Sequence, residues 1–452
     1  MRGLVLEGGG AKGSYQLGAY KALLEMDIEI SGITGTSIGA INGAMIAQGD
    51  FDKAKELWMA IDPEEVFKMS TEDLSDLMNL NFDKNNFSRI FGRIKIIFDN
   101  KGIDLDNIRR YLDTYVDEQK VRKSQLDFGL VTYSLTDFEP LELFIEDIPE
   151  GKLVEYLLAS SYLPAFKGEK LDGKRFIDGA VHDNLPINML VGKGYNEIIA
   201  VRTYGSGRIR PVDDEVSVSV QYIGPTEDLG RVLEFVPERI EHNIRLGYLD
   251  TWRHYENLQG TNYYIRAVDD EDYYFQLWQT IDNKSVLEAG RLLGCKEFPA
   301  KRLLFEKIIP RLQSLLELEE TVGYRELLVA ALEVLAAKLD IEPYEIYDFD
   351  EFIRKIEKRY QSGMELDFRE LPDFLKQNEL LSRAVRDDLA LELISILFDG
   401  FFQHEKRLEL AGLDSSENGN AEFGNDGARF GDDSAGIGND KSKFSKEEKD
   451  DN

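Results

Sequence analysis

The chain has 452 residues and a formal net charge of −31, with 85 acidic and 54 basic side chains. This length allows two or three domains. So acidic a chain is unsuited to binding nucleic acid, or to docking on an anionic membrane through charge alone. A single cysteine, Cys295, excludes an internal disulfide and fits a reducing compartment, and we expect it to fill a small space in a helical core.

No run of 18 or more apolar residues occurs, so we expect no transmembrane helix. The chain begins with an apolar strand pattern rather than a charged leader, and we therefore expect a cytoplasmic protein.

The first 25 residues predict a strand, a glycine-rich loop and a helix. Leu4 to Glu7 form a short apolar run typical of a buried strand, and the loop Gly8-Gly9-Gly10-Ala11-Lys12-Gly13 follows directly. From Ser14 to Glu25, apolar side chains recur on one helical face. Glycines in such a loop leave backbone N–H groups accessible to an anionic group, because no Cβ atoms cover them.

Two kinds of phosphate-binding loop share this arrangement. A Walker A loop needs Lys and then Ser or Thr directly after its second glycine. Here Ser14-Tyr15 follows Gly13, which excludes a Walker A loop. Gly8, Gly10 and Gly13 do match the dinucleotide pattern G-x-G-x-x-G, and Glu29 lies near the position of an acidic ribose ligand. On the loop alone, nucleotide binding therefore stays open.

The next segment favours nucleophilic catalysis. Ile28 to Ile33 predicts a second strand, which leads into Gly35-Thr36-Ser37-Ile38-Gly39 and a helix. This is the G-x-S-x-G pattern of a nucleophile elbow, a strained turn that exposes one hydroxyl. The flanking glycines, Gly35 and Gly39, prevent collisions with the neighbouring strand and helix. A dinucleotide fold has no use for such a serine, whereas a hydrolase needs both the serine and amide donors for the oxyanion.

A serine nucleophile requires a base. The histidines of the chain are His182, His242, His254 and His404. We expect the last three to be solvated or packed, and only His182 lies near a motif. Asp178 follows the apolar pair Phe176-Ile177 and precedes the turn Gly179-Ala180, so it is a candidate to take the proton from Ser37 directly. Burial would raise its pKa above the ordinary value of about 3.9 and make it an effective base near neutral pH.

In this order, the glycine loop, the Ser37 elbow and Asp178-Gly179-Ala180 resemble the three motifs of the patatin-like phospholipases. The stretches Ala159 to Phe166 and Asn184 to Ile187 agree with that family, and the resemblance covers roughly the first 265 residues. It implies an α/β fold, patatin-like, with three α/β/α layers and a mainly parallel sheet. It also implies hydrolysis of lipid acyl esters by a Ser–Asp dyad, without metal or cofactor.

The resemblance also implies a role for each motif residue. Ser37 is the expected nucleophile, Asp178 the expected base, and the amides of Gly8 to Gly13, chiefly Gly9 and Gly10, the expected oxyanion hole. Lys12 replaces the arginine that is more usual in the family, and we expect little consequence because the backbone amides stabilise the charge.

The remaining pattern predicts how the chain is divided. We expect a catalytic domain at residues 1–270, an α-helical region at 271–410 and a disordered acidic tail at 411–452. Further strands are predicted at 128–135, 141–144, 197–204, 216–223 and, as the last one, 262–267.

Residues 86–100 are locally basic and amphipathic. They predict either a helix packed on the core or a lid that makes transient contact with a membrane surface.

The sequence therefore predicts a serine carboxylic-ester hydrolase that cleaves a lipid or another acyl ester through an acyl-enzyme. Two alternatives stay open: an acyltransferase that uses the same dyad, and a non-catalytic interaction protein on the same fold. No nucleic-acid partner is expected, and protein partners are not predicted.

Overall fold

The computed structural model describes residues 1–62, 106–162, 170–213, 217–295, 298–319, 321–361 and 383–402. All of them lie within one compact unit, Met1–His404. The amphipathic stretch at 86–100 and the predicted tail at 411–452 lie outside the described residues. Among the residues described, no helix combines the length and the apolar character needed to cross a bilayer.

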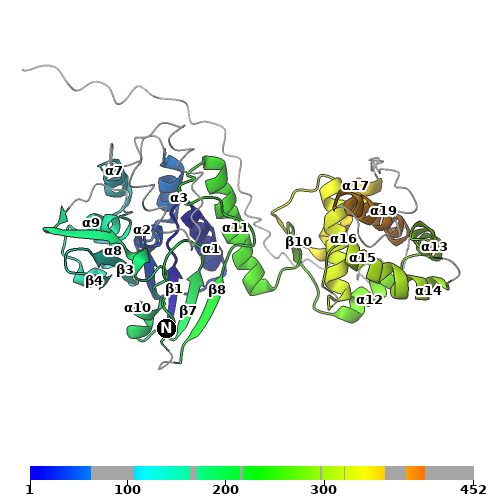
Figure 1. Cartoon of the computed structure of the whole chain (residues 1–452), viewed down its shortest axis with the longest axis horizontal. Helices are drawn as coiled ribbons and strands as arrows, with labels where there is room; N and C mark the ends of the chain where they lie inside the picture. The colour runs from blue at the N-terminus through cyan, green and yellow to red at the C-terminus, as the bar shows by residue number, and fades with distance from the viewer. Residues whose placement is uncertain are drawn as a thin grey trace, which may run out of the picture. The chain divides into compact units, whose positions relative to one another are not determined.

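A mixed sheet forms the centre of the N-terminal part of the chain (Figure 1). Its strands are β1 (Arg2–Leu6), β2 (Gly32–Thr36), β3 (Asp127–Ser134), β4 (Glu139–Phe144), β5 (Lys170–Leu171), β6 (Lys174–Asp178), β7 (Glu197–Val201) and β8 (Ser219–Ile223). Five strands in the order β3-β2-β1-β7-β8 are parallel. Strands β4 and β6 pair with β3 in the antiparallel sense, and β5 pairs with β6.

Alternating side chains show that helices cover both faces of this sheet. Leu4 and Leu6 of β1 pack with residues of α1 (Ser14–Glu25) and α11 (Pro237–Glu256). Val5, which points to the opposite face, packs with residues of α10 (Ile187–Gly192). Strand β7 alternates between the same two clusters. The three-layer α/β/α architecture expected from the sequence is therefore confirmed.

Further helices pack around the β2–β3 side of the sheet, and their residues share one hydrophobic cluster. They are α2 (Ile38–Ala47), α3 (Phe51–Ala60), α7 (Asp106–Tyr115), α8 (Glu118–Lys123) and α9 (Leu153–Ser160). Short 3₁₀ turns connect the elements: η1 (Gly10–Gly13), η2 (Ile145–Asp147) and η3 (Gly179–Val181).

The second strand begins later than the sequence predicted. Strand β2 starts at Gly32, not at Ile28, because the chain turns at Asp27 with a positive φ and then enters an extended loop. Ile28 and Ile30 pack against the core from this loop. Their apolar pattern therefore reflects contact with the core and not strand pairing.

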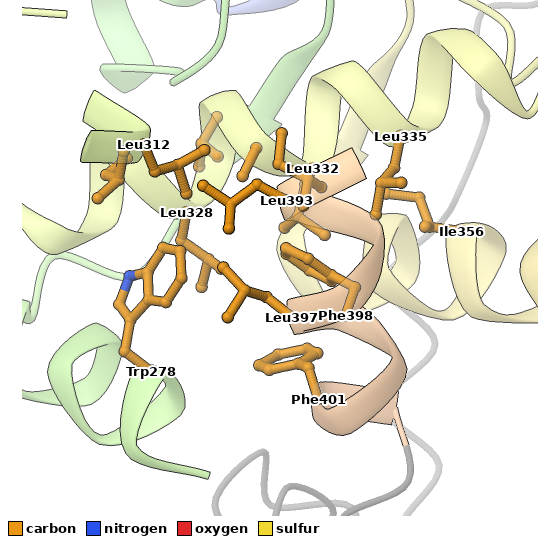
Figure 2. Packing of buried hydrophobic residues seen from close by; sticks show 14 of the residues in the cluster. Trp278, Leu312, Leu328, Leu332, Leu335, Ile356, Leu393, Leu397, Phe398 and Phe401 are labelled. Atoms are coloured by element: carbon orange, nitrogen blue, oxygen red, sulfur yellow. The ribbon is translucent and has the colours of Figure 1, made fainter. Parts of the chain in front are cut away.

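The C-terminal part is mainly helical and has its own hydrophobic cluster. Its elements are α12 (Glu271–Gln279), α13 (Asn283–Leu292), α14 (Ala300–Leu303), the π-helical segment η4 (Leu304–Ile308), α15 (Ile309–Leu315), α16 (Tyr324–Lys338), α17 (Phe349–Gln361) and α19 (Arg383–Phe402). Figure 2 shows Leu328 and Leu332 of α16 facing Leu393 and Leu397 of α19, with Trp278 beside them. The boundary predicted at residue 270 stays a prediction.

One expectation about this region is wrong. The strand predicted at 262–267 is β9 (Tyr264–Arg266), but it is not the last strand and does not join the main sheet. It pairs in parallel with β10 (Ile346–Asp348), which lies among the helices. The two strands are some eighty residues apart in the chain. Pairing between such distant strands leaves no local periodic pattern, so the sequence did not reveal it.

Two glycines allow α1 and α11 to pack backbone against backbone. A Cβ atom added to Gly18 of α1 would lie 1.8 Å from the carbonyl oxygen of Ile244. A Cβ atom added to Gly247 of α11 would lie 1.9 Å from the carbonyl oxygen of Tyr15. Since α1 directly follows the glycine loop, this contact helps to fix the position of the loop.

Replacing Gly247 by Ala is therefore expected to lower the free energy of unfolding by about 1–3 kcal/mol, because the helices must separate to admit the methyl group. Gly192→Ala is the matched control, since nothing lies within 4 Å of its added Cβ. Urea unfolding of both variants measures the difference. Equal stability of Gly247→Ala and wild type would contradict the close-packing interpretation.

Candidate active site

The register of β3 brings two distant segments together. All of strand β4 pairs with one edge of β3, where it lies opposite Gly129 to Ser134. On the other edge β2 pairs as far as Thr36 opposite Val131, and β6 then pairs with Asp178 opposite Thr132. Because β2 is parallel and β6 antiparallel to β3, their C-terminal ends face each other. This register brings Ser37, the residue after β2, next to Asp178, the last residue of β6.

Ser37 adopts the backbone conformation expected of a nucleophile elbow. Its φ is 57° and its ψ is −127°, directly before α2, and a positive φ is costly for a residue with a side chain. The neighbouring glycines are needed on steric grounds. A Cβ atom at Gly35 would lie 2.3 Å from the Gly39 carbonyl oxygen, and one at Gly39 would lie 2.2 Å from that of Leu6.

Asp178 is buried and in direct contact with Ser37. Its side chain accepts a 2.8 Å hydrogen bond from the Ala180 N–H, and the Ser37 hydroxyl interacts with it as a second donor. Burial raises the pKa of Asp178 to about 6, and the two hydrogen bonds oppose this rise only in part. The turn after it is tightly packed, since a Cβ atom at Gly179 would lie 2.3 Å from the Val131 carbonyl oxygen. A carboxylate with this pKa is a far better proton acceptor than a solvated one.

The glycine loop passes beside Ser37. Its own hydrogen bonds reduce the number of backbone amides that can donate to an oxyanion. A Cβ atom at Gly8 would lie 3.3 Å from the Ser37 Cβ atom. However, the Gly8 N–H already donates to the Asn184 carbonyl oxygen at 3.1 Å, and the Ala11 N–H donates to that of Val232 at 2.7 Å. Gly8 and Ala11, both included in the predicted hole, therefore have no free amide to offer an oxyanion.

The amides of Gly9 and Gly10 have no hydrogen-bond partner among the described residues. Lys12 cannot share this role well, since its N–H points back to the Gly9 carbonyl oxygen at 3.4 Å. Gly10 also has a φ of 58°, and a Cβ atom on it would lie 2.1 Å from the Val232 carbonyl oxygen. The loop therefore needs glycine at position 10 for both its shape and its packing.

Residues that the sequence analysis did not assign hold this loop in place. The carbonyl oxygen of Gly8 accepts from the Asn184 side-chain amide at 3.2 Å and from the Thr203 hydroxyl at 2.9 Å. Fully buried Glu7 forms an ion pair with Arg202 at 2.9 Å and accepts from the Thr203 N–H at 2.7 Å. The sequence held one signal of this arrangement, the stretch that contains Asn184.

A second set of buried hydrogen bonds ties the loop to the helices behind it. Gln16 donates to the Glu7 carbonyl oxygen at 2.6 Å, and Asn42 donates to both Gln16 and the Gly13 carbonyl oxygen at 2.9 Å. Trp58 completes the set by donating to Asn42 at 2.9 Å. The loop is therefore fixed by polar contacts from α1, α2 and α3.

His182 has a different partner. Its Nε2 atom lies 3.0 Å from the Glu142 carboxylate on β4, which also accepts from Arg210 at 2.7 Å. Among the described residues, no hydrogen bond joins His182 to Ser37. A carboxylate, and not an imidazole, therefore contacts the elbow hydroxyl.

Comparison with known proteins agrees with this geometry. Residues 4–191 match the family model described as patatin-like phospholipase. Residues 4–191, which are less than half of the chain, are therefore similar to this family. Strands β2 to β6, the part of β1 from Leu4 onward, and the contact between Ser37 and Asp178 lie within the matched segment.

Several curated proteins are similar to this chain over part of their length. Patatin-like phospholipase domain-containing protein 6 of Mus musculus is 25% identical over 293 residues, which are 59% of this chain and 18% of that protein. Lysophospholipase NTE1 of Kluyveromyces lactis is 26% identical over 278 residues, 57% of this chain and 16% of that protein. The chain thus matches less than a fifth of the length of these relatives.

Among solved structures, VipD from Legionella pneumophila is 14% identical, with 90% of this chain and 92% of that chain covered and a TM-score of 0.37.

The buried carboxylate leads to a prediction about stability. The folded pKa of Asp178 is about 6, against an ordinary value of 3.8. Between these values the folded protein keeps a proton that the unfolded chain has lost, so ionisation of Asp178 destabilises the fold as the pH rises through this window. Asp178→Asn is therefore expected to be more stable than wild type at pH 7–8, by about 2–3 kcal/mol.

This difference should largely disappear below about pH 3, where the wild-type side chain is mostly protonated in both states. Urea unfolding at several pH values measures it. A variant that is less stable than wild type at pH 8 would contradict the assignment of a buried, costly charge.

Proposed function

We propose that this protein is a lipid acyl hydrolase in which Ser37 attacks the ester carbonyl and Asp178 accepts the proton. The observation that carries the proposal is the placement of the strained Ser37 elbow beside the buried carboxylate of Asp178, whose pKa burial raises to about 6. A structural carboxylate gains nothing from a strained serine beside it, whereas a nucleophile needs both a base and an exposed elbow.

The geometry supports a two-step reaction. In the first step Ser37 Oγ bonds to the acyl carbon, its proton moves to Asp178, and the free amides of Gly9 and Gly10 donate to the developing oxyanion. The proton then passes to the leaving alkoxide as the ester bond breaks. In the second step water gives a proton to Asp178 and bonds to the acyl carbon. As the bond from that carbon to Ser37 Oγ breaks, Asp178 returns the proton to Oγ and the fatty acid is released. Each oxyanion donor is expected to contribute about 3 kcal/mol to the lowering of the barrier.

The class of substrate comes from the family. The related proteins are named phospholipases and lysophospholipases, so we infer a phospholipid or lysophospholipid ester. An acyltransferase would use the same residues and differ only in the acceptor of the acyl group. Product analysis separates the two, because hydrolysis yields free fatty acid in proportion to ester consumed.

Labelling with a fluorophosphonate probe tests the proposed nucleophile. Wild type is expected to carry one adduct, which peptide mapping should locate at Ser37. Ser37→Ala should not react, and Asp178→Asn should react at least 100-fold more slowly because no group removes the proton. Ser161→Ala is the control, since Ser161 donates to the Leu157 carbonyl oxygen at 3.1 Å and no hydrogen bond joins it to Ser37 among the described residues. An unlabelled wild type, or an adduct that persists in Ser37→Ala, would refute the proposal.

A further inference from the structure

The strained backbone of Ser37 requires a specific anchor. Strand β2 ends at Thr36 and α2 begins at Ile38, so the Ser37 N–H belongs neither to the strand pairing nor to the helix. An unfavourable φ of this kind persists only when surrounding contacts hold it. A buried N–H without a partner would add a further cost.

Ser160, the last residue of α9, supplies that partner. Its Oγ atom accepts a hydrogen bond from the Ser37 N–H at 2.9 Å and donates one to the Val131 carbonyl oxygen at 2.7 Å. Ser160 is fully buried. Because its only proton is directed to Val131, the lone pairs of the hydroxyl are left to accept from Ser37. The Ser37 N–H is therefore the donor, and the Ser160 Oγ atom the acceptor, of this hydrogen bond.

Val131 is the point on β3 where the two halves of the site meet. Its pairing partner is Thr36, and the next residue, Thr132, pairs with Asp178. The Thr132 hydroxyl in turn donates to the Ala159 carbonyl oxygen at 2.9 Å, which holds the end of α9 against the same strand. Ser160 therefore links the elbow to the same stretch of β3 that pairs with Asp178.

We propose that Ser160 is a positioning residue that sets the orientation of the Ser37 hydroxyl toward Asp178. This inference rests on the proposed function. Ser160 does not itself react, because it is fully buried and its proton is held by the Val131 carbonyl oxygen. It acts through the main chain of Ser37. Without it, the elbow relaxes and the Ser37 hydroxyl leaves the line between Asp178 and the substrate carbonyl.

Ser160→Ala tests the inference, with the rate of fluorophosphonate labelling and the kcat and KM for a water-soluble ester as readouts. We expect the labelling rate and kcat to fall by about 100-fold, the size of effect that a small misplacement of a reacting group produces. The KM should stay near that of wild type, because Ser160 does not touch the substrate. Ser160→Thr, which restores the hydroxyl, should recover most of the rate.

Two controls separate positioning from stability. Ser395→Ala removes another buried hydroxyl that donates to a backbone carbonyl, at 2.8 Å from Leu391, far along the chain in α19. It should lower the melting temperature by a similar amount and leave the labelling rate unchanged. Should Ser160→Ala not fold, Ser160→Cys keeps a side chain of similar shape with a weak acceptor and should show the same loss.

Wild-type labelling rates in folded Ser160→Ala, or a loss no greater than that of Ser395→Ala, would overturn the positioning role and leave the proposed function intact. An unlabelled wild type would instead overturn the proposed function, and this inference with it.

Discussion

The site depends on one constraint, the meeting of β2 and β6 end to end along a single edge of β3. Val131 pairs with Thr36, and the next residue of β3, Thr132, pairs with Asp178. These pairings bring Ser37 next to Asp178, which lies 141 positions further along the chain (178 − 37). Backbone hydrogen bonds of a sheet hold this register to within a fraction of a residue, because a slip would turn every side chain to the other face. A direct Ser–Asp contact is therefore a consequence of sheet pairing and needs no flexible connector between the two groups.

The features that suit the site for chemistry are also those that lower stability. Ser37 has a positive φ, Asp178 is a buried acid, and two amides of the glycine loop have no partner among the described residues. The surrounding structure compensates through close contacts that hold the backbone of the site in one conformation. These include the close approach of α1 to α11, the ion pair of buried Glu7 with Arg202, and the hydrogen bonds of Asn184 and Thr203 to Gly8. The rigid surroundings keep the strained groups in place.

The sequence was sufficient for the parts of the site that depend on local conformation. The glycine loop and the elbow each follow a strand and precede a helix, and glycine leaves a clear pattern where side chains would collide. Asp178 was found for the same reason, through its position before a glycine turn. Non-local partners left no such pattern. That the amides of Gly8 and Ala11 are occupied by Asn184 and Val232, and that Ser160 contacts the Ser37 N–H, follows only from tertiary packing. The pairing of β9 with β10 was missed on the same grounds.

In the proposed reaction a carboxylate, without an imidazole, accepts the proton of Ser37. The pH dependence of kcat/KM for a water-soluble ester tests it most directly, because this quantity reports the ionisation of the free enzyme. The rate should fall tenfold per pH unit below a midpoint near 6, and Asp183→Asn should show the same midpoint. Asp183 is the appropriate control, since burial raises its pKa to about 6 as well, while its carboxylate accepts from the Leu185 and Arg210 amides. A midpoint that shifts in Asp183→Asn, or a pH dependence that disappears in His182→Gln, would contradict the account.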